Sequence, residues 1–267
     1  MLKDHSRKRL LSYLGIIALT LVAGLTLKIF IIDAVCVPSA SMESTLLPGD
    51  YIFVNKLIYG AKLPRKIPFS HASLPLFRFP SLKNIQRGDV IVFEFPQEIA
   101  TRIDPLYFVK RCVGIAGDTI AIHDGNLFVN GKVFRQSHMT LIGENERYGP
   151  VVIPSVGSVV TITDENYSVM ESLIKIEGHT IERSPSTNFI IDGQPASTYK
   201  VMKNYFFVLG DNIDHSSDSR SWGFLSEDNI IGQAMVVYWS VEAGKSSPRL
   251  TGIFSSIRWN RIGTFIY

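Results

Sequence analysis

Phe108-Val109-Lys110-Arg111-Cys112-Val113 is the most informative stretch of this chain of 267 residues. Its β-branched and aromatic residues predict a strand. Because successive side chains of a strand point to opposite faces, Lys110 and Arg111 lie on opposite sides, so one of them faces the buried side. Burial lowers the pKa of a lysine and can leave it neutral, as a general base must be. Spacing alone favours the alternative, which is an edge strand with both charges in water.

Three other runs share this composition and predict further strands of a mainly β fold: residues 51–54, 90–95 and 234–239. Within residues 127–134, Asn130-Gly131 predicts a tight hairpin, because both residues accept the positive φ angles of such a turn. An apolar stripe at helical spacing predicts one short helix at Tyr167, Met170, Leu173 and Ile174.

One pattern occurs twice along the chain. Gly117-Asp118-Thr119-Ile120 leads to Asn130-Gly131, and Gly178-His179-Thr180-Ile181 leads to Asp192-Gly193 at nearly the same spacing. The pattern is either a degenerate internal duplication or a coincidence, and the sequence favours neither.

Residues 10–27 carry no charge and, as a helix, would be roughly 27 Å long, which nearly spans a bilayer core. The apolar run resumes after Lys28, which can extend to the headgroups, and Asp33 marks the exit. The basic residues before the run predict a cytoplasmic N-terminus. The alternatives are a cleavable signal peptide and a buried core helix. The length of the run and the lack of a small-x-small cleavage pattern at residues 33–36 favour an anchor.

The charge distribution argues against a nucleic-acid-binding protein. Four of the 27 basic residues and one of the 24 acidic residues lie in residues 1–9, which accounts for the whole net charge of +3. The six histidines show no metal-ligand spacing, so we expect neither a metal nor another cofactor. Cys36 and Cys112 are interpreted as small buried residues, not as a disulfide framework.

Two segments are rich in hydroxyl groups and turn formers: residues 38–46 and residues 210–220. Each by itself is typical of a solvated loop. Taken in order with the strand at residues 108–113, however, these segments resemble the motifs of the bacterial type I signal peptidases. The resemblance extends from the N-terminal anchor to about Trp239. It rests on four groups of residues: 38–42; 47–51 with Lys56 and 59–60; 108–114 with 117–118; and 210–212 with Ser216, 218–220 and 222–223.

The resemblance implies a Ser-Lys dyad, in which Ser41 is the nucleophile and Lys110 is the general base. It implies that Ser216 orients the lysine amine and that the Ser39 hydroxyl and the Ser41 backbone N–H form the oxyanion hole. It also assigns a supporting ion pair and the walls of the substrate pocket. The pair is Asp218 and Arg220, and the walls are Val37, Met42, Leu46, Phe108 and Val109.

The chain departs from the family pattern at two positions. Ser44 stands where the family usually has proline, and Ile213 stands where it usually has arginine. Neither position carries a proposed catalytic group, so the departures bear on local rigidity more than on activity.

The resemblance also implies the architecture, an antiparallel β catalytic core with an inserted smaller α+β domain behind one transmembrane helix. The boundaries follow: a cytoplasmic basic tail at 1–9, the anchor at 10–32, catalytic β parts at 34–119 and 206–242, the inserted domain at 120–205, and a C-terminal basic and aromatic segment at 243–267.

The implied function is cleavage of signal peptides from exported preproteins, after small residues in an Ala-x-Ala-like pattern, at the outer face of the cytoplasmic membrane. The implied partners are those signal peptides and the lipid bilayer, and we expect a monomer. Two alternatives stay open: a self-cleaving Ser-Lys repressor-type protease, and a membrane-anchored β-rich binding module without catalysis. The anchor and the lack of an N-terminal DNA-binding segment argue against the repressor.

Overall fold

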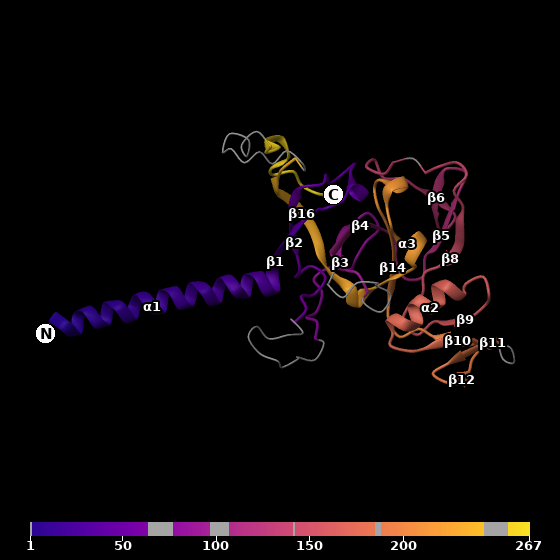
Figure 1. Cartoon of the computed structure of the whole chain (residues 1–267), viewed down its shortest axis with the longest axis horizontal. Coiled ribbons are helices and arrows are strands. Elements are labelled where there is room, and N and C mark those ends of the chain that lie inside the picture. The colour runs from indigo at the N-terminus through magenta and orange to yellow at the C-terminus, as the bar shows by residue number, and fades with distance from the viewer. Residues whose placement is uncertain (1, 64–76, 97–106, 141, 185–187, 243–255) are drawn as a thin grey trace.

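A computed structural model of the chain shows one long helix that leads directly into a β-rich body (Figure 1). Helix α1 (Leu2–Thr26) continues through a π-helical turn (Leu27–Ile31) into strand β1 (Ile32–Cys36). The segment Leu11–Ile31 is long and apolar enough to cross a membrane, and none of it is buried in the body. The alternative of a buried core helix is therefore wrong. The structure describes residues 2–63, 77–96, 107–140, 142–184, 188–242 and 256–267.

The centre of the body is a seven-stranded sheet in the order β1-β2-β16-β3-β4-β14-β15. Every neighbouring pair in it is antiparallel, so the predicted mainly β, antiparallel fold is confirmed. All four runs with strand composition lie in this sheet. Its further strands are β2 (Asp50–Asn55), β3 (Val90–Glu94), β4 (Tyr107–Gly114), β14 (Tyr205–Leu209), β15 (Leu225–Ser226) and β16 (Ile230–Ser240).

Between β4 and β14 the chain forms smaller sheets and one amphipathic helix, α2 (Tyr167–Ile176), whose predicted stripe packs into the core. Ile120 and Ile153 of this part share an apolar cluster with Phe207 and Leu209 of β14. The smaller sheets consist of β5 (Thr119–His123), β6 (Asn126–Val129), β7 (Lys132–Phe134) and β8 (Tyr148–Val152); β9 (Val159–Thr161) with β13 (Thr198–Lys200); and β10 (Ile181–Ser184), β11 (Asn188–Ile191) and β12 (Gln194–Pro195).

The repeated sequence pattern folds into the same local structure twice. In the first copy, the Thr119 N–H donates to the Asn130 side chain at 2.8 Å; in the second, the Thr180 N–H donates to the Asp192 side chain at 2.8 Å. Asn130 and Asp192 both have positive φ angles, and a glycine follows each of them. Each copy pairs three successive strands, β5-β6-β7 and β10-β11-β12. The structure therefore favours an internal repeat over coincidence.

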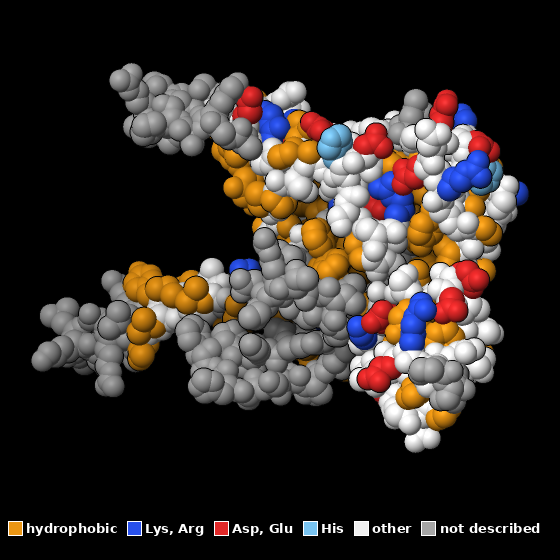
Figure 2. Space-filling model, turned by 45° about the vertical axis from the view of Figure 1, so that its right-hand side comes forward, with side chains coloured by type: hydrophobic (Ala, Val, Ile, Leu, Met, Phe, Trp, Pro, Cys, Tyr) orange, Lys and Arg blue, Asp and Glu red, His pale blue; other side chains and the backbone are white. Residues whose placement is uncertain are grey.

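The C-terminal residues 256–267 pack beside β16. The Ile266 N–H donates to the Met235 carbonyl at 2.9 Å, and Arg261 forms an ion pair with the buried Asp50 at 2.5 Å. Leu11, Ile17 and Leu19 of α1 are exposed, and hydrophobic side chains make up most of the described part of this helix in the space-filling view (Figure 2). Residues 243–255 of the predicted C-terminal segment lie outside the described residues.

Candidate active site

Ser41 lies on a short 3₁₀ helix (Ala40–Met42) that follows β1 after three residues. Backbone hydrogen bonds between Val37 and the turn before β2 fix the chain just ahead of this helix: the Val37 N–H donates to the Asp50 carbonyl at 2.8 Å, and the Gly49 N–H donates to the Val37 carbonyl at 2.9 Å. The Ser39 hydroxyl oxygen lies 3.3 Å from the Ser41 Oγ. Because β1 continues directly from the apolar helix, these contacts also set the distance of Ser41 from the apolar span.

The Nζ of Lys110 lies 2.5 Å from the Oγ of Ser41, although 69 positions separate the two residues in the sequence. Lys110 belongs to β4, which pairs with β3 from Tyr107 to Arg111 and with β14 only from Arg111 to Gly114. The alternative of an edge strand with both charges in water is wrong, because Lys110 and Arg111 are both buried. Only 2% of Lys110 is exposed, and burial lowers the pKa of its amine to about 8 against the opposing effect of the Asp218 and Asp211 carboxylates. A large fraction of the amine is therefore neutral at mildly alkaline pH.

Arg111, next to Lys110 in β4, is also completely buried, so the strand carries a cation into the interior on each of its faces. All five N–H donors of the guanidinium have an acceptor. Two bonds go to the Asp211 carboxylate, and the others go to the Thr45 hydroxyl and to the carbonyls of Gly88 and Tyr267, at 2.7 to 3.1 Å. Burial of an arginine is tolerated only with such complete pairing.

Arg111, Asp211 and Thr45 also belong to this site, although no role was predicted for them from the sequence. The alternation of Lys110 and Arg111 pointed to one buried cation, whereas the structure buries both. Asp211 and Thr45 lie far from β4 in the sequence, so no local pattern connects them with Arg111.

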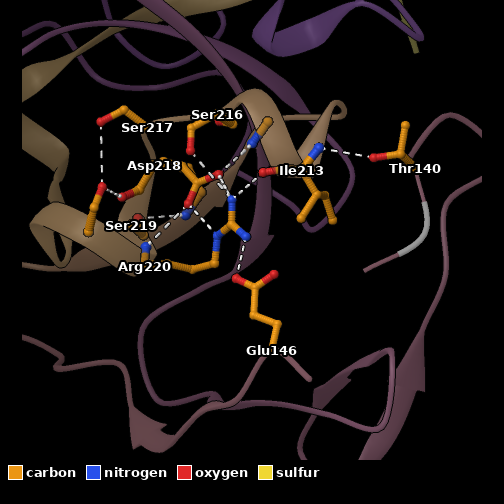
Figure 3. A network of polar contacts seen from close by, with 11 residues as sticks. Thr140, Glu146, Ile213, Ser216, Ser217, Asp218, Ser219 and Arg220 are labelled. Atoms are coloured by element: carbon orange, nitrogen blue, oxygen red, sulfur yellow. Dashed lines mark hydrogen bonds and ion pairs between the residues drawn. The ribbon is translucent and has the colours of Figure 1, made fainter. Parts of the chain in front are cut away.

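The loop after β14 contacts the nucleophile turn directly. The Asn212 N–H donates to the Ser41 carbonyl at 3.1 Å, and the Asn212 side chain donates to the Ala40 carbonyl at 3.1 Å. Farther along the loop, the Arg220 guanidinium pairs with the Asp218 carboxylate at 2.8 Å, and Asp218 also accepts from the Gly210 N–H (Figure 3). The structure thus brings the predicted ion pair into the loop that touches Ser41.

The Ser216 Oγ is buried and has no hydrogen-bond partner among the described residues, so a bond to Lys110 is not present. Ser216 is nevertheless close to the nucleophile turn, because a Cβ added at Gly210 would meet both the Ser216 Oγ and the Ser41 carbonyl oxygen. Its orienting role stays a prediction.

Gly210→Ala should therefore reduce turnover strongly, by about 100-fold, because the added methyl group displaces the Ser41 backbone or the Ser216 side chain. Cleavage kinetics together with a thermal melt check this. Gly143→Ala is the matched control, since an added Cβ there meets no atom within 4 Å. Equal activity of the two variants would contradict the close approach at Gly210.

Four of the five predicted pocket residues lie in one apolar cluster and are almost fully buried: Val37, Met42, Leu46 and Val109. Phe108 packs against a different cluster, and its ring lies 5.8 Å from the Lys110 amine. The structure therefore brings four of the predicted wall residues into one cluster and places the fifth beside the predicted base. Among the described residues, no group of three or more side chains could hold a metal ion.

The family model "Signal peptidase, peptidase S26" matches residues 10–239. Three bacterial proteins named signal peptidase I are similar over most of their length. That of Aquifex aeolicus is 30% identical and aligns over 90% of this chain and 88% of its own. Those of Pseudomonas aeruginosa and Buchnera aphidicola subsp. Baizongia pistaciae are 32% and 33% identical, over 81% and 89% of this chain and 68% and 77% of their own. By this match and these relatives, the chain belongs to the signal peptidase family, peptidase S26.

Proposed function

We propose that the chain is a type I signal peptidase, a serine endopeptidase that removes signal peptides from exported preproteins, with Ser41 as the nucleophile and Lys110 as the general base. The single observation that carries this proposal is the distance of 2.5 Å between the Ser41 Oγ and a buried lysine amine of lowered pKa. Neither a binding module nor a repressor-type protease accounts as well for this pair together with the membership of the family.

The neutral amine of Lys110 accepts the Ser41 proton while the Oγ attacks the carbonyl carbon of the substrate. The Ser41 N–H and the Ser39 hydroxyl stabilise the oxyanion that forms, and the 3.3 Å between the two hydroxyl oxygens supports this role for Ser39. Lys110 then donates its proton to the leaving amine as the peptide bond breaks. In the second half of the reaction, Lys110 takes a proton from water, which hydrolyses the acyl-enzyme. Ser216, Asp218 and Arg220 position these groups and do not exchange protons.

The substrate binds as an extended strand beside the first half of β4. Strand β14 pairs with β4 only from Arg111 to Gly114, so Tyr107–Lys110 has β3 on one side and no strand of the described residues on the other. An extended peptide can pair with such an edge, which would bring its carbonyl groups toward Ser41. We propose that the tightly packed walls at Val37, Met42, Leu46, Phe108 and Val109 restrict the pocket to small side chains.

The apolar helix anchors the chain in the cytoplasmic membrane. We propose that its basic N-terminal end is cytoplasmic and that the β body lies on the outer side, where preproteins emerge. We also propose that the chain acts as a monomer. We propose an inserted domain at 120–205, and the smaller sheets, whose strands lie between Thr119 and Lys200, support this proposal.

The direct test is incubation of the full chain, in detergent, with a preprotein, followed by sequencing of the new N-terminus. We expect a single cut after a small residue at the end of the signal peptide. An intact preprotein after incubation with the folded chain would contradict the proposed function.

The rate of cleavage should rise with pH through about 8 and then level off, because only the unprotonated amine of Lys110 can accept the Ser41 proton. Below this pH the amine is an ammonium ion and the rate falls. The pH profile of kcat/KM measures the pKa of the free enzyme. A profile that stays flat from acid to alkaline pH would argue against a lysine base.

A further inference from the structure

The chain between β7 and β8 contacts the loop 210–220 at two points, and it belongs to none of the four groups of residues that carry the family resemblance (Figure 3). Thr140 makes the first contact and Glu146 makes the second. Both residues come from the part of the chain proposed as the inserted domain, so that part reaches the segment that touches Ser41.

Thr140 holds the beginning of the loop with three hydrogen bonds. Its N–H and its hydroxyl both donate to the Asp211 carbonyl, at 2.8 and 3.1 Å, and its hydroxyl oxygen accepts from the Ile213 N–H at 3.0 Å. A threonine hydroxyl can donate and accept at once, and a valine of the same shape can do neither. Asp211 in turn binds Arg111, the neighbour of Lys110 in β4. The contact therefore reaches the strand that carries the proposed base.

Glu146 holds the end of the loop through Arg220. Its carboxylate pairs with the Arg220 guanidinium at 2.5 Å. The same guanidinium also donates to the Asp218 carboxylate and to the Ile213 and Ser216 carbonyls. A guanidinium held on several sides by fixed acceptors has little freedom to rotate. Glu146 thus provides Arg220 with an acceptor from outside the loop.

Ser216 lies between these two points of attachment. Its backbone carbonyl accepts from Arg220, whereas its own Oγ is buried and has no hydrogen-bond partner among the described residues. The bonds through Thr140 and Arg220 therefore fix the backbone on both sides of Ser216. Ordering a free loop costs conformational entropy, and the external bonds to Thr140 and Glu146 lower that cost for Ser216.

We propose that Thr140 and Glu146 are positioning residues, which hold the loop 210–220 so that the Ser216 hydroxyl stays beside Ser41 and Lys110. This inference rests on the proposed function. The inserted part of the chain then contributes directly to the geometry of catalysis.

The test measures kcat and KM of the full chain in detergent on a preprotein, together with thermal melts. Thr140→Val and Glu146→Gln should each lower kcat by about 10- to 100-fold, with KM within about twofold of the original chain. Thr140→Ser keeps the hydroxyl and should restore most of the rate. Glu144→Gln removes a nearby exposed carboxylate and serves as the control.

A double-mutant cycle separates positioning of Ser216 from general destabilisation. In a Ser216→Ala background, Thr140→Val and Glu146→Gln should have little further effect, because the group they position is gone. If Thr140→Val and Glu146→Gln lowered kcat by the same factor in the Ser216→Ala background as in the original chain, the inference would be overturned. Unchanged kcat in both single variants would also overturn it. If Thr140→Val unfolds the chain, Glu146→Gln carries the test, since the Glu146 side chain is 31% exposed.

The Ser41→Ala variant separates failure of this inference from failure of the proposed function. Cleavage that persists without the Ser41 hydroxyl contradicts the proposed function itself. Cleavage that needs Ser41 but not Thr140 or Glu146 contradicts only their positioning role.

Discussion

Replacement of Ser41 with alanine is expected to abolish cleavage, with a loss in kcat on the order of 10⁶-fold, by comparison with a serine protease that loses its nucleophile. Only 7% of Ser41 is exposed, and its Oγ is the group 2.5 Å from the Lys110 amine. Removal of one oxygen leaves no nucleophile there and changes the packing little. Cleavage of a preprotein by the full chain in detergent gives the rate, and circular dichroism checks the fold.

Ser44→Ala is the matched control for this experiment, because Ser44 belongs to the same hydroxyl-rich segment but is exposed. We expect this variant to cleave at the original rate. Undiminished cleavage by Ser41→Ala would show that another residue is the nucleophile, and the proposed dyad would be wrong.

Lys110→Met should cause a loss of similar size, because methionine fills much of the same volume and has no amine to accept the proton. The side chain is 2% exposed, so the variant exchanges a buried polar group for an apolar one, and we expect the melting temperature to stay the same or rise. The loss of activity is therefore separable from a loss of stability. The rate of preprotein cleavage and a thermal melt on the same sample test both expectations.

Lys110→Arg makes the test sharper. An arginine keeps a positive charge at this position, but its guanidinium does not deprotonate in proteins, so it cannot act as the base. Lys132→Met, at an exposed position on β7, controls for removal of a lysine. If Lys110→Arg cleaved at the original rate, the cation and not a neutral amine would be the feature that matters.

Periodic and turn-forming patterns were sufficient to predict most of the local structure. The strand at residues 108–113, the hairpin at Asn130-Gly131 and the helix with its stripe at Met170 and Leu173 all form as expected. These features depend on side-chain alternation, positive φ angles and helical spacing, which are properties of neighbours in the sequence.

The same patterns were insufficient for Arg111. The alternation of side chains along β4 predicted that one of Lys110 and Arg111 is buried, and the edge-strand alternative predicted that neither is. The structure buries both. The second is stable because Thr45, Asp211, Gly88 and Tyr267, from four separate segments, satisfy its donors. Such pairing depends on which segments meet after folding, and local periodicity carries no information about it.

The apolar span, the mainly β body and the three motif segments that carry Ser41, Lys110 and Ser216 could all be predicted from residue patterns and the family resemblance. No such pattern could show that the Lys110 amine lies 2.5 Å from the Ser41 Oγ, or that the Ser216 hydroxyl makes no hydrogen bond to this amine. The pKa of a lysine depends on how deeply its amine is buried. Whether two groups form a hydrogen bond depends on differences of a few tenths of an ångström in the distance between them. The burial of Lys110 and its distance from Ser41 are set by two features of the fold. These are the antiparallel pairing of β4 with β3 and β14, and the contact of Asn212 with the nucleophile turn.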